Sequence, residues 1–201
     1  MKPLSLAVLA SGRGSNFQAI YQAIGAGVLQ ARIDVVLSDK EEAPVLDKAR
    51  GAGIPAFGLN IKNYSSKEQF EAALLEIIRE YQCDCIVLAG YMRVLTPYFI
   101  RNAGRPILNI HPSLLPAFPG LHAQRQALDY GVRYSGCTVH FVDEGVDTGP
   151  IIMQAVVPVY PDDDEESLSQ RILQEEHRIY PQVLALLSQG RIKREGRKVI
   201  I

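Results

Sequence analysis

Residues 4–25 read LSLAVLASGRGSNFQAIYQAIG, and this stretch decides the fold. It opens with a short apolar run, Leu4 to Leu9, which has the length and composition of a buried strand. A glycine-containing loop follows at 10–16, and apolar residues then recur at helical spacing from Asn16 to Ile24. A strand, a glycine loop and a helix in this order are typical of the start of a βαβ unit.

The same alternation continues to His111. Further strands are predicted at 33–37, 55–59, 85–89 and 107–110, and helices at 44–52, 67–81 and 97–103. Ser65 and Ser66 stand before Glu68 and Gln69, a capping-box signal for the start of the second of these helices. Apolar strands that alternate with helices predict a Rossmann-like α/β fold, with a mainly parallel central sheet and helices on both faces.

The pattern changes after His111. Three prolines at 112, 116 and 119 disfavour regular structure, and a helix is then predicted at 123–130. Two strands, 136–142 and 151–159, enclose a turn, and a long helix at 167–187 contains Pro181, where we expect a bend. A last strand is predicted at 197–201. Because no repeat and no linker interrupts the chain, we expect a single domain over residues 1–201.

Composition excludes several classes of protein. Of 201 residues, 47% are hydrophobic and 21% are charged, which is ordinary globular usage and excludes a disordered chain. The 21 basic and 22 acidic residues nearly cancel, so binding of nucleic acid is disfavoured as the main role. The longest apolar runs are too short to span a membrane, and we identify no signal peptide. The sequence carries no signal for an oligomeric state.

The three cysteines, Cys83, Cys85 and Cys137, are too few and too scattered for a disulfide framework. An odd, small number of thiols favours a reducing compartment, so we expect a cytoplasmic protein. The Cys83-Asp84-Cys85 pair has no second pair nearby to complete the four ligands of a structural zinc site. We therefore expect no metal.

The first candidate site is the loop at 10–16. Its glycines let backbone N–H groups turn toward a ligand, the following helix adds positive potential, and Ser15 and Asn16 supply further donors. A phosphate group is the favoured ligand. A nucleotide cofactor remains open, since Asp39 stands roughly where a ribose-binding acid would, although Phe17 replaces the third glycine of a dinucleotide motif. A purely structural turn is the third interpretation.

Two other stretches carry polar groups that suit catalysis. In the run NIHPSLLP at 109–116, Asn109 and His111 are two residues apart on an extended segment and so share one face. They lie at the carboxyl end of a central strand, where open α/β sheets bind ligands, although a buried histidine and a turn asparagine are the plain alternatives. The acidic turn at 143–149 contains Asp147, which is either catalytic or simply solvated; the pattern of a calcium loop is missing.

Together these stretches resemble the phosphoribosylglycinamide formyltransferase family. The resemblance rests on the Gly12-x-Gly14-Ser15-Asn16 loop, the NIHPSLLP run with Pro119-Gly120, and the Asp147-x-Gly149-Pro150 turn, and it extends to Tyr180-Pro181. It implies an enzyme of purine synthesis that transfers the formyl group of 10-formyltetrahydrofolate to the amine of glycinamide ribonucleotide. The NIHPSLLP run is shared with other folate-dependent formyl-transfer enzymes. A formyltransferase or a formyl-folate hydrolase that acts on another acceptor is therefore the alternative.

The resemblance also implies roles for individual residues. The substrate phosphate would be held by Gly14, Ser15 and Asn16, and its glycinamide part by Glu176. The folate pocket would be lined by Lys67, Met92, Arg93, Val94, Leu95, Asn109, Val142 and Asp143. Lys67 stands where relatives often carry an arginine. The catalytic group would be Asn109, His111 and Asp147.

These three side chains suit direct formyl transfer. Asn109 would donate to the tetrahedral oxyanion, His111 would move a proton, and Asp147 would favour the charged imidazole. No cysteine belongs to the group, so we expect no covalent enzyme intermediate. Two other classes stay open: a nicotinamide-dependent enzyme that uses the glycine loop, and a non-catalytic folate- or nucleotide-binding protein.

Overall fold

The structure is a computed structural model that describes residues 2–201. The chain divides into two compact units, the first ending at Leu108 and the second running from Asn109 to Ile201. The division falls inside a strand, between Leu108 and Asn109. We describe each unit by itself, and the expected single domain over 1–201 stays a prediction.

Unit 1 contains four parallel strands: β1 (Leu4–Leu9), β2 (Ala31–Ser38), β3 (Ala56–Gly58) and β4 (Cys85–Leu88). Their order in the sheet is β3-β2-β1-β4. β1 is the central strand, and its residues from Leu6 onward are fully buried, as its unbroken apolar run predicts. The predicted parallel α/β arrangement is confirmed here.

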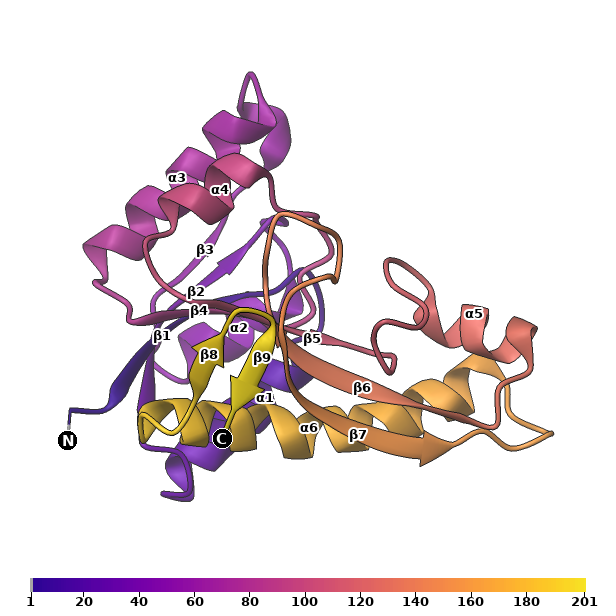
Figure 1. Cartoon of the computed structure of the whole chain (residues 1–201). Helices are drawn as coiled ribbons and strands as arrows, with labels where there is room; N and C mark the ends of the chain where they lie inside the picture. The colour runs from indigo at the N-terminus through magenta and orange to yellow at the C-terminus, as the bar shows by residue number, and fades with distance from the viewer. Residues whose placement is uncertain (1) are drawn as a thin grey trace. The chain divides into compact units, whose positions relative to one another are not determined.

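The helices of unit 1 are α1 (Ser15–Gly25), α2 (Pro44–Gly51), α3 (Lys67–Glu80) and α4 (Pro97–Asn102), with a 3₁₀ turn at Ile61–Asn63. The chain moves outward from β1 to β2 and β3 and then returns to β4. Because crossover connections are right-handed, α1 and α2 lie on one face of the strands and α3 on the other. Figure 1 shows α3 and α4 above the strands and α1 and α2 below them. Helices on both faces are thus confirmed.

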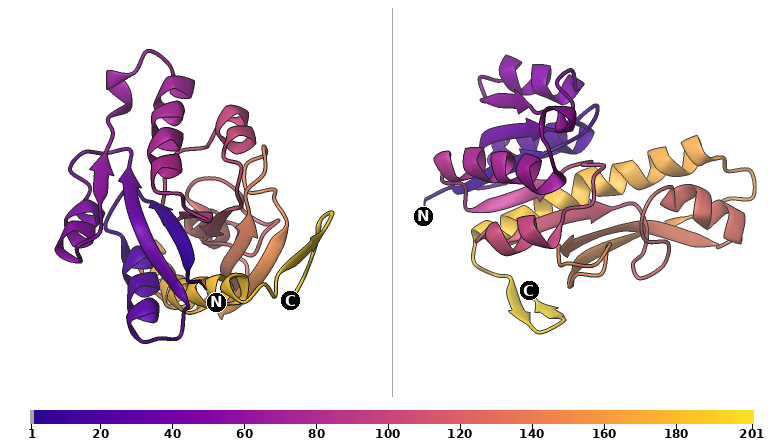
Figure 2. Two further views of the ribbon diagram at one scale, coloured as in Figure 1. Left: turned by 90° about the vertical axis from the view of Figure 1, so that its left-hand side faces the viewer. Right: turned by 90° about the horizontal axis from the view of Figure 1, so that it is seen from above.

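Unit 2 begins within β5 (Ile107–His111) and continues with α5 (Ala123–Tyr130), β6 (Tyr134–Phe141), β7 (Ile151–Pro158) and α6 (Glu165–Ser188). β6 and β7 form an antiparallel pair, with β6 between β5 and β7. α6 packs along both strands of this pair. A short hairpin, β8 (Lys193–Glu195) and β9 (Lys198–Ile200), follows and extends away from the end of α6 (Figure 2).

The structure differs from the sequence prediction at the C-terminal end. The strand predicted at 197–201 is one arm of the β8–β9 hairpin, whose turn contains Gly196 in the left-handed region. α6 begins two residues earlier than predicted, because Asp164 and Ser167 form a capping box that starts it at Glu165. Pro181 lies inside α6. Among residues 2–201, the structure contains no helix with the length and apolar character needed to cross a membrane.

Candidate active site

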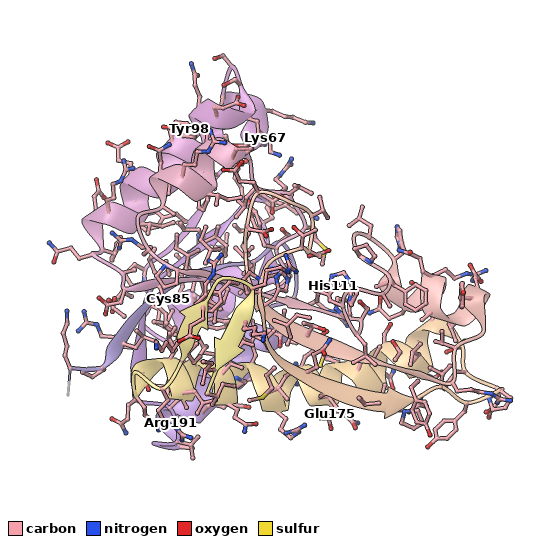
Figure 3. All side chains as sticks on the ribbon, viewed as in Figure 1. Lys67, Cys85, Tyr98, His111, Glu175 and Arg191 are labelled. Carbon is pink, nitrogen blue, oxygen red and sulfur yellow. The ribbon has the colours of Figure 1, made fainter. Side chains whose placement is uncertain are left out.

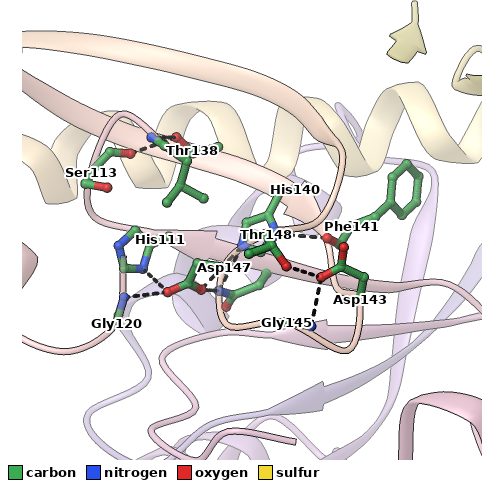
Figure 4. Close-up of polar contacts among 12 residues, drawn as sticks. His111, Ser113, Gly120, Thr138, His140, Phe141, Asp143, Gly145, Asp147 and Thr148 are labelled. Carbon is green, nitrogen blue, oxygen red and sulfur yellow. Dashed lines mark hydrogen bonds and ion pairs between the residues drawn. The ribbon is translucent and has the colours of Figure 1, made fainter. Parts of the chain in front are cut away.

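A polar cluster in unit 2 is built around the carboxylate of Asp147. Asn109 and His111 reach it from β5, which places them on one face, as their spacing predicts. The amide nitrogen of Asn109 lies 3.4 Å from Asp147 Oδ1, and Nδ1 of His111 lies 3.3 Å from Oδ2. The backbone N–H of Gly120 also donates to Oδ2, at 2.8 Å (Figure 4). The three residues predicted to be catalytic therefore meet at one carboxylate.

The turn that carries Asp147 is held in an unusual backbone conformation. Asp147 has a φ of 54°, in the left-handed region. The carboxylate of Asp143 accepts hydrogen bonds from the Gly145 N–H at 3.2 Å and from the Thr148 hydroxyl at 2.6 Å. The guanidinium of Arg197 donates to the Thr148 carbonyl at 3.0 Å. These contacts fix the turn on both sides of Asp147.

His111 has an acceptor at each ring nitrogen. Nε2 lies 2.8 Å from the carbonyl oxygen of Phe118, and Nδ1 faces Asp147. A ring with a hydrogen on both nitrogens satisfies both contacts, since neither a carbonyl nor a carboxylate can donate. The imidazole of His111 is therefore held on both sides, with its Nδ1 edge toward Asp147.

A second histidine, His140 at the end of β6, completes the cluster. Its Nδ1 lies 2.8 Å from the Phe141 carbonyl, and its Nε2 lies 3.2 Å from the Asn109 amide nitrogen. Burial lowers the pKa of His140 below its usual value, although the Phe141 carbonyl and the carboxylate of Asp147 act in the opposite direction. Sequence reasoning missed this residue. A single histidine in a buried strand is ordinarily a core residue, so no signal in the sequence marked it.

In unit 1, Gly14, Ser15 and Asn16 lie at the start of α1, where the first N–H groups of a helix have no intrahelical partner. Gly14 is the N-cap residue and has a φ of 69°. A Cβ atom there would lie 2.5 Å from Cγ2 of Val45. Both the conformation and the packing therefore require glycine at this position.

The segment 91–96, which contains the predicted folate-lining residues, is tied to the rest of unit 1 by four contacts. The Met92 N–H donates to the Ser11 hydroxyl at 2.9 Å, and Thr96 bonds to the carboxylate of Glu71. Lys67 donates to the Val94 carbonyl, so the structure brings two predicted folate-lining positions together. Figure 3 shows Lys67 at the start of α3, close to α4, which carries Tyr98.

The apolar side chains of this segment divide into two groups. Met92 and Val94 are 64% and 55% exposed, whereas Leu95 is buried in the core. Two large apolar side chains are thus available to a ligand on a segment whose backbone is fixed. Leu95 instead anchors the segment.

The fourth contact of the segment is the ion pair between Arg93 and Asp39, at 2.8 Å. Asp39 is buried and already engaged by this guanidinium. The ion pair occupies Asp39 Oδ2, which weakens the nicotinamide alternative, whereas Asp39 Oδ1 is buried without a hydrogen-bond partner.

The remaining predicted residues lie in unit 2. Val142 and Asp143 follow β6, and the carboxylate of Asp143 is used within its own turn. Glu176 is buried on α6. Over residues 2–201, no group of three or more His, Cys, Asp or Glu side chains is arranged to hold a metal ion.

Comparison with known proteins identifies one matching family and several similar proteins. The family described as formyl transferase matches residues 4–184. The chain is 43% identical over 190 residues to phosphoribosylglycinamide formyltransferase of Escherichia coli, covering 94% of this chain and 90% of that protein. It is 50% identical over 187 residues to a trifunctional purine biosynthetic protein of Drosophila melanogaster. That match covers 92% of this chain but 14% of the longer protein.

Solved structures agree with these matches. The crystal structure of glycinamide ribonucleotide transformylase 1 from Symbiobacterium toebii has a TM-score of 0.97 and 50% identity, and the match covers 100% of this chain and 94% of that chain. The phosphoribosylglycinamide formyltransferase of Coxiella burnetii, in complex with CHES, has a TM-score of 0.94 and 39% identity, covering 99% of this chain and 93% of that one. The prediction of the family from the sequence is confirmed. On the match over residues 4–184 and these relatives, the chain belongs to the formyl transferase family.

Proposed function

We propose that this chain transfers the formyl group of 10-formyltetrahydrofolate to the amine of glycinamide ribonucleotide, as a cytoplasmic enzyme of purine biosynthesis. The observation that carries the proposal is the convergence of Asn109 and His111 on the carboxylate of Asp147. The names of the relatives supply the acceptor, and the resemblance of the sequence to a folate-dependent family supplies the donor. The three cysteines are buried and free, which is consistent with a reducing compartment.

The chemistry requires a donor pair and a proton acceptor. The substrate amine attacks the formyl carbon, a tetrahedral oxyanion forms, and the bond from this carbon to the folate nitrogen N10 then breaks. Asn109 and His111 lie 3.4 and 3.3 Å from the Asp147 carboxylate, so both side chains are placed to present a hydrogen to an oxyanion that forms beside it. One such donor is worth roughly 3–4 kcal/mol in other acyl-transfer sites.

Proton balance involves the same residues. The attacking amine must lose one proton and the departing N10 must gain one. Asp147 is a carboxylate that pairs with His111, so a proton taken from the amine passes within the pair and is returned to N10. Within residues 2–201, no cysteine is among the contacts of Asn109, His111 and Asp147, which favours direct transfer between the two substrates.

We assign substrate-binding roles to residues of each unit separately. In unit 1, the N–H groups of the first turn of α1 and the side chains of Ser15 and Asn16 suit a phosphate. The exposed Met92 and Val94 suit the flat, largely apolar ring system of the folate. In unit 2, we assign Val142 and Asp143 to the folate and Glu176 to the glycinamide part.

The proposal is tested by mixing the protein with 10-formyltetrahydrofolate and glycinamide ribonucleotide and following tetrahydrofolate and the formylated ribonucleotide. We expect the two products in equal amounts and no turnover with glycinamide that lacks the ribose phosphate. Release of tetrahydrofolate without an acceptor would indicate a formyl-folate hydrolase instead. Absence of turnover with both substrates would overturn the proposal.

A further inference from the structure

We propose that Lys48 of α2 is a positioning residue for the substrate phosphate: its ammonium holds the Arg13 carbonyl and thereby turns the N–H of Gly14 toward the phosphate. This inference rests on the proposed function, which assigns the start of α1 to that phosphate. Lys48 lies in the last turn of α2, on a different element from the loop at 10–16. It was not among the predicted site residues.

The first observation is that α2 holds two successive carbonyls of the loop. The backbone N–H of Val45 donates to the Gly12 carbonyl at 3.2 Å. Nζ of Lys48 donates to the Arg13 carbonyl at 2.7 Å. The side chain of Val45 also packs against Gly14, where a Cβ atom would lie 2.5 Å from Cγ2. The loop is therefore fixed against α2 by a backbone donor, a charged side chain and an apolar contact.

The second step is the direction of the N–H groups. A trans peptide group is planar, and its N–H points away from its C=O. The Gly12 carbonyl belongs to the same peptide group as the Arg13 N–H, and the Arg13 carbonyl to the same group as the Gly14 N–H. Since both carbonyls face donors of α2, both N–H groups point away from α2. Within residues 2–201, neither N–H donates to another group of the protein.

These two N–H groups extend the row of donors at the start of α1. The N–H groups of Ser15 and Asn16 come next in the chain and lie in the first turn of the helix, where N–H groups have no intrahelical partner. Successive N–H groups around a left-handed residue such as Gly14 form a concavity that suits an anion. α1 orients the later donors of the row, whereas α2 orients the first two.

Lys48 makes the one holding contact that a side-chain substitution can remove directly. A hydrogen bond from an ammonium to a carbonyl is charge-assisted and stronger than a neutral one. Without it, the peptide group between Arg13 and Gly14 is free to turn, and its carbonyl oxygen can then face the phosphate, which it repels. The KM for the ribonucleotide should rise. The kcat should not change, because the cluster around Asp147 is untouched.

The experiment compares two substitutions of Lys48 with a control on the same helix. Met has a similar length and no donor, whereas Arg keeps both the donor and the charge. We expect Lys48→Met to raise the KM for glycinamide ribonucleotide by about 5- to 20-fold, with kcat and the KM for the folate within about 2-fold. Lys48→Arg should recover most of this loss. Arg50→Met removes a positive charge from the same turn, where Arg50 pairs with Asp47 at 3.1 Å, and should leave these constants unchanged.

A second readout does not depend on activity. The backbone amide resonances of Arg13 and Gly14 are followed by NMR while inorganic phosphate is added to the protein. In the wild type and in Lys48→Arg, both amides should shift as phosphate binds. In Lys48→Met, the Gly14 amide should have a different shift before phosphate is added, and the Kd for phosphate should be about 5- to 20-fold higher.

The outcomes separate this inference from the proposed function. An unchanged KM and an unchanged phosphate Kd in Lys48→Met would overturn the role of Lys48, as would equal losses in Lys48→Met and Arg50→Met, which would indicate a general effect of charge. Weaker phosphate binding with an unchanged Gly14 resonance in the free protein would show that Lys48 contacts the phosphate itself and does not position the loop. A wild-type protein without formyl transfer would overturn the proposed function. The phosphate titration would still show whether Lys48 orients the loop.

Discussion

Asp147 combines two properties that a substitution can separate, a charge that faces three donors and a left-handed backbone conformation. Asparagine tolerates this conformation better than most residues, so Asp147→Asn removes the charge and keeps the turn. We expect kcat to fall at least about 100-fold, while the KM for the ribonucleotide stays nearly unchanged. The free energy of unfolding should change by about 1 kcal/mol or less. Steady-state kinetics and urea unfolding of the same preparation measure both effects. A variant that loses stability but keeps its rate would show that Asp147 only shapes the turn.

His111 offers a second test at this scale. The His111→Ala variant removes the ring that links the Phe118 carbonyl to Asp147. We expect a folded protein whose turnover is lower by at least about 100-fold, the usual range for an acid–base group. Circular dichroism and a thermal melt establish that the variant is folded. Turnover close to that of the wild type would contradict the proposed mechanism.

The sequence predicts the place of some residues in the site and not of others. Asn109 and His111 were predictable, because a spacing of two in a strand puts both on one face. Their meeting with Asp147 depends on a turn 36 residues after His111, and the resemblance to a known family indicated it. His140 was not predicted, since a single histidine in an apolar strand is ordinarily a core residue. Its place beside Asn109 follows from the position of β6 next to β5 in the sheet, which no local sequence pattern shows.

At the scale of elements, the start of α1 supports a matched pair of glycine substitutions. Gly14→Ala places a methyl group against Val45 and forces a non-glycine residue to a φ of 69°, which costs about 1–2 kcal/mol before the steric clash is counted. We expect lower stability and a KM for the ribonucleotide that rises much more than the KM for the folate. Gly12→Ala meets nothing within 4 Å and should leave stability unchanged. Equal changes in both KM values for Gly14→Ala would show that this loop does not bind the phosphate.

The elements themselves were largely predictable. The apolar runs of β1 and β4 and the helical spacing of α1 are local signals, and the structure confirms them. The start of α6 was placed too late because the capping residue Asp164 lies in an acidic run that gives no clear boundary. The β8–β9 hairpin was read as one strand, because its first arm is charged and exposed. In both regions apolar periodicity, the main signal, is weak.

At the scale of the whole molecule, the lowered pKa values of two histidines indicate how the free energy of unfolding depends on pH. Burial lowers the pKa of both His140 and His177 below 6.5 in the folded protein. The unfolded chain therefore binds more protons than the folded one at acid pH. The stability that these neutral rings confer is fully present above about pH 6.5 and is lost as the pH falls toward their folded pKa values. Each ring contributes at most about 1.4 kcal/mol per pH unit.

Urea unfolding between pH 7.5 and 5 measures this dependence. His140→Gln should have a shallower decline below pH 6.5 than the wild type, because its side chain does not titrate. If the free energy of unfolding falls equally steeply with pH in the two proteins, His140 does not contribute to the pH dependence of stability.

Gly149 illustrates how such a network limits change in the sequence. A Cβ atom at this position would lie 1.7 Å from the Phe141 carbonyl oxygen, the same oxygen that accepts the Nδ1 hydrogen of His140. Any side chain at 149 must displace that oxygen, and with it the acceptor that sets the tautomer of His140. In a saturation-mutagenesis library selected for activity, position 149 should therefore be as intolerant as the catalytic positions. Gly149 would then be constrained as strongly as a catalytic side chain, although it contacts no substrate. An alignment alone would not distinguish this packing constraint from a direct contact with substrate.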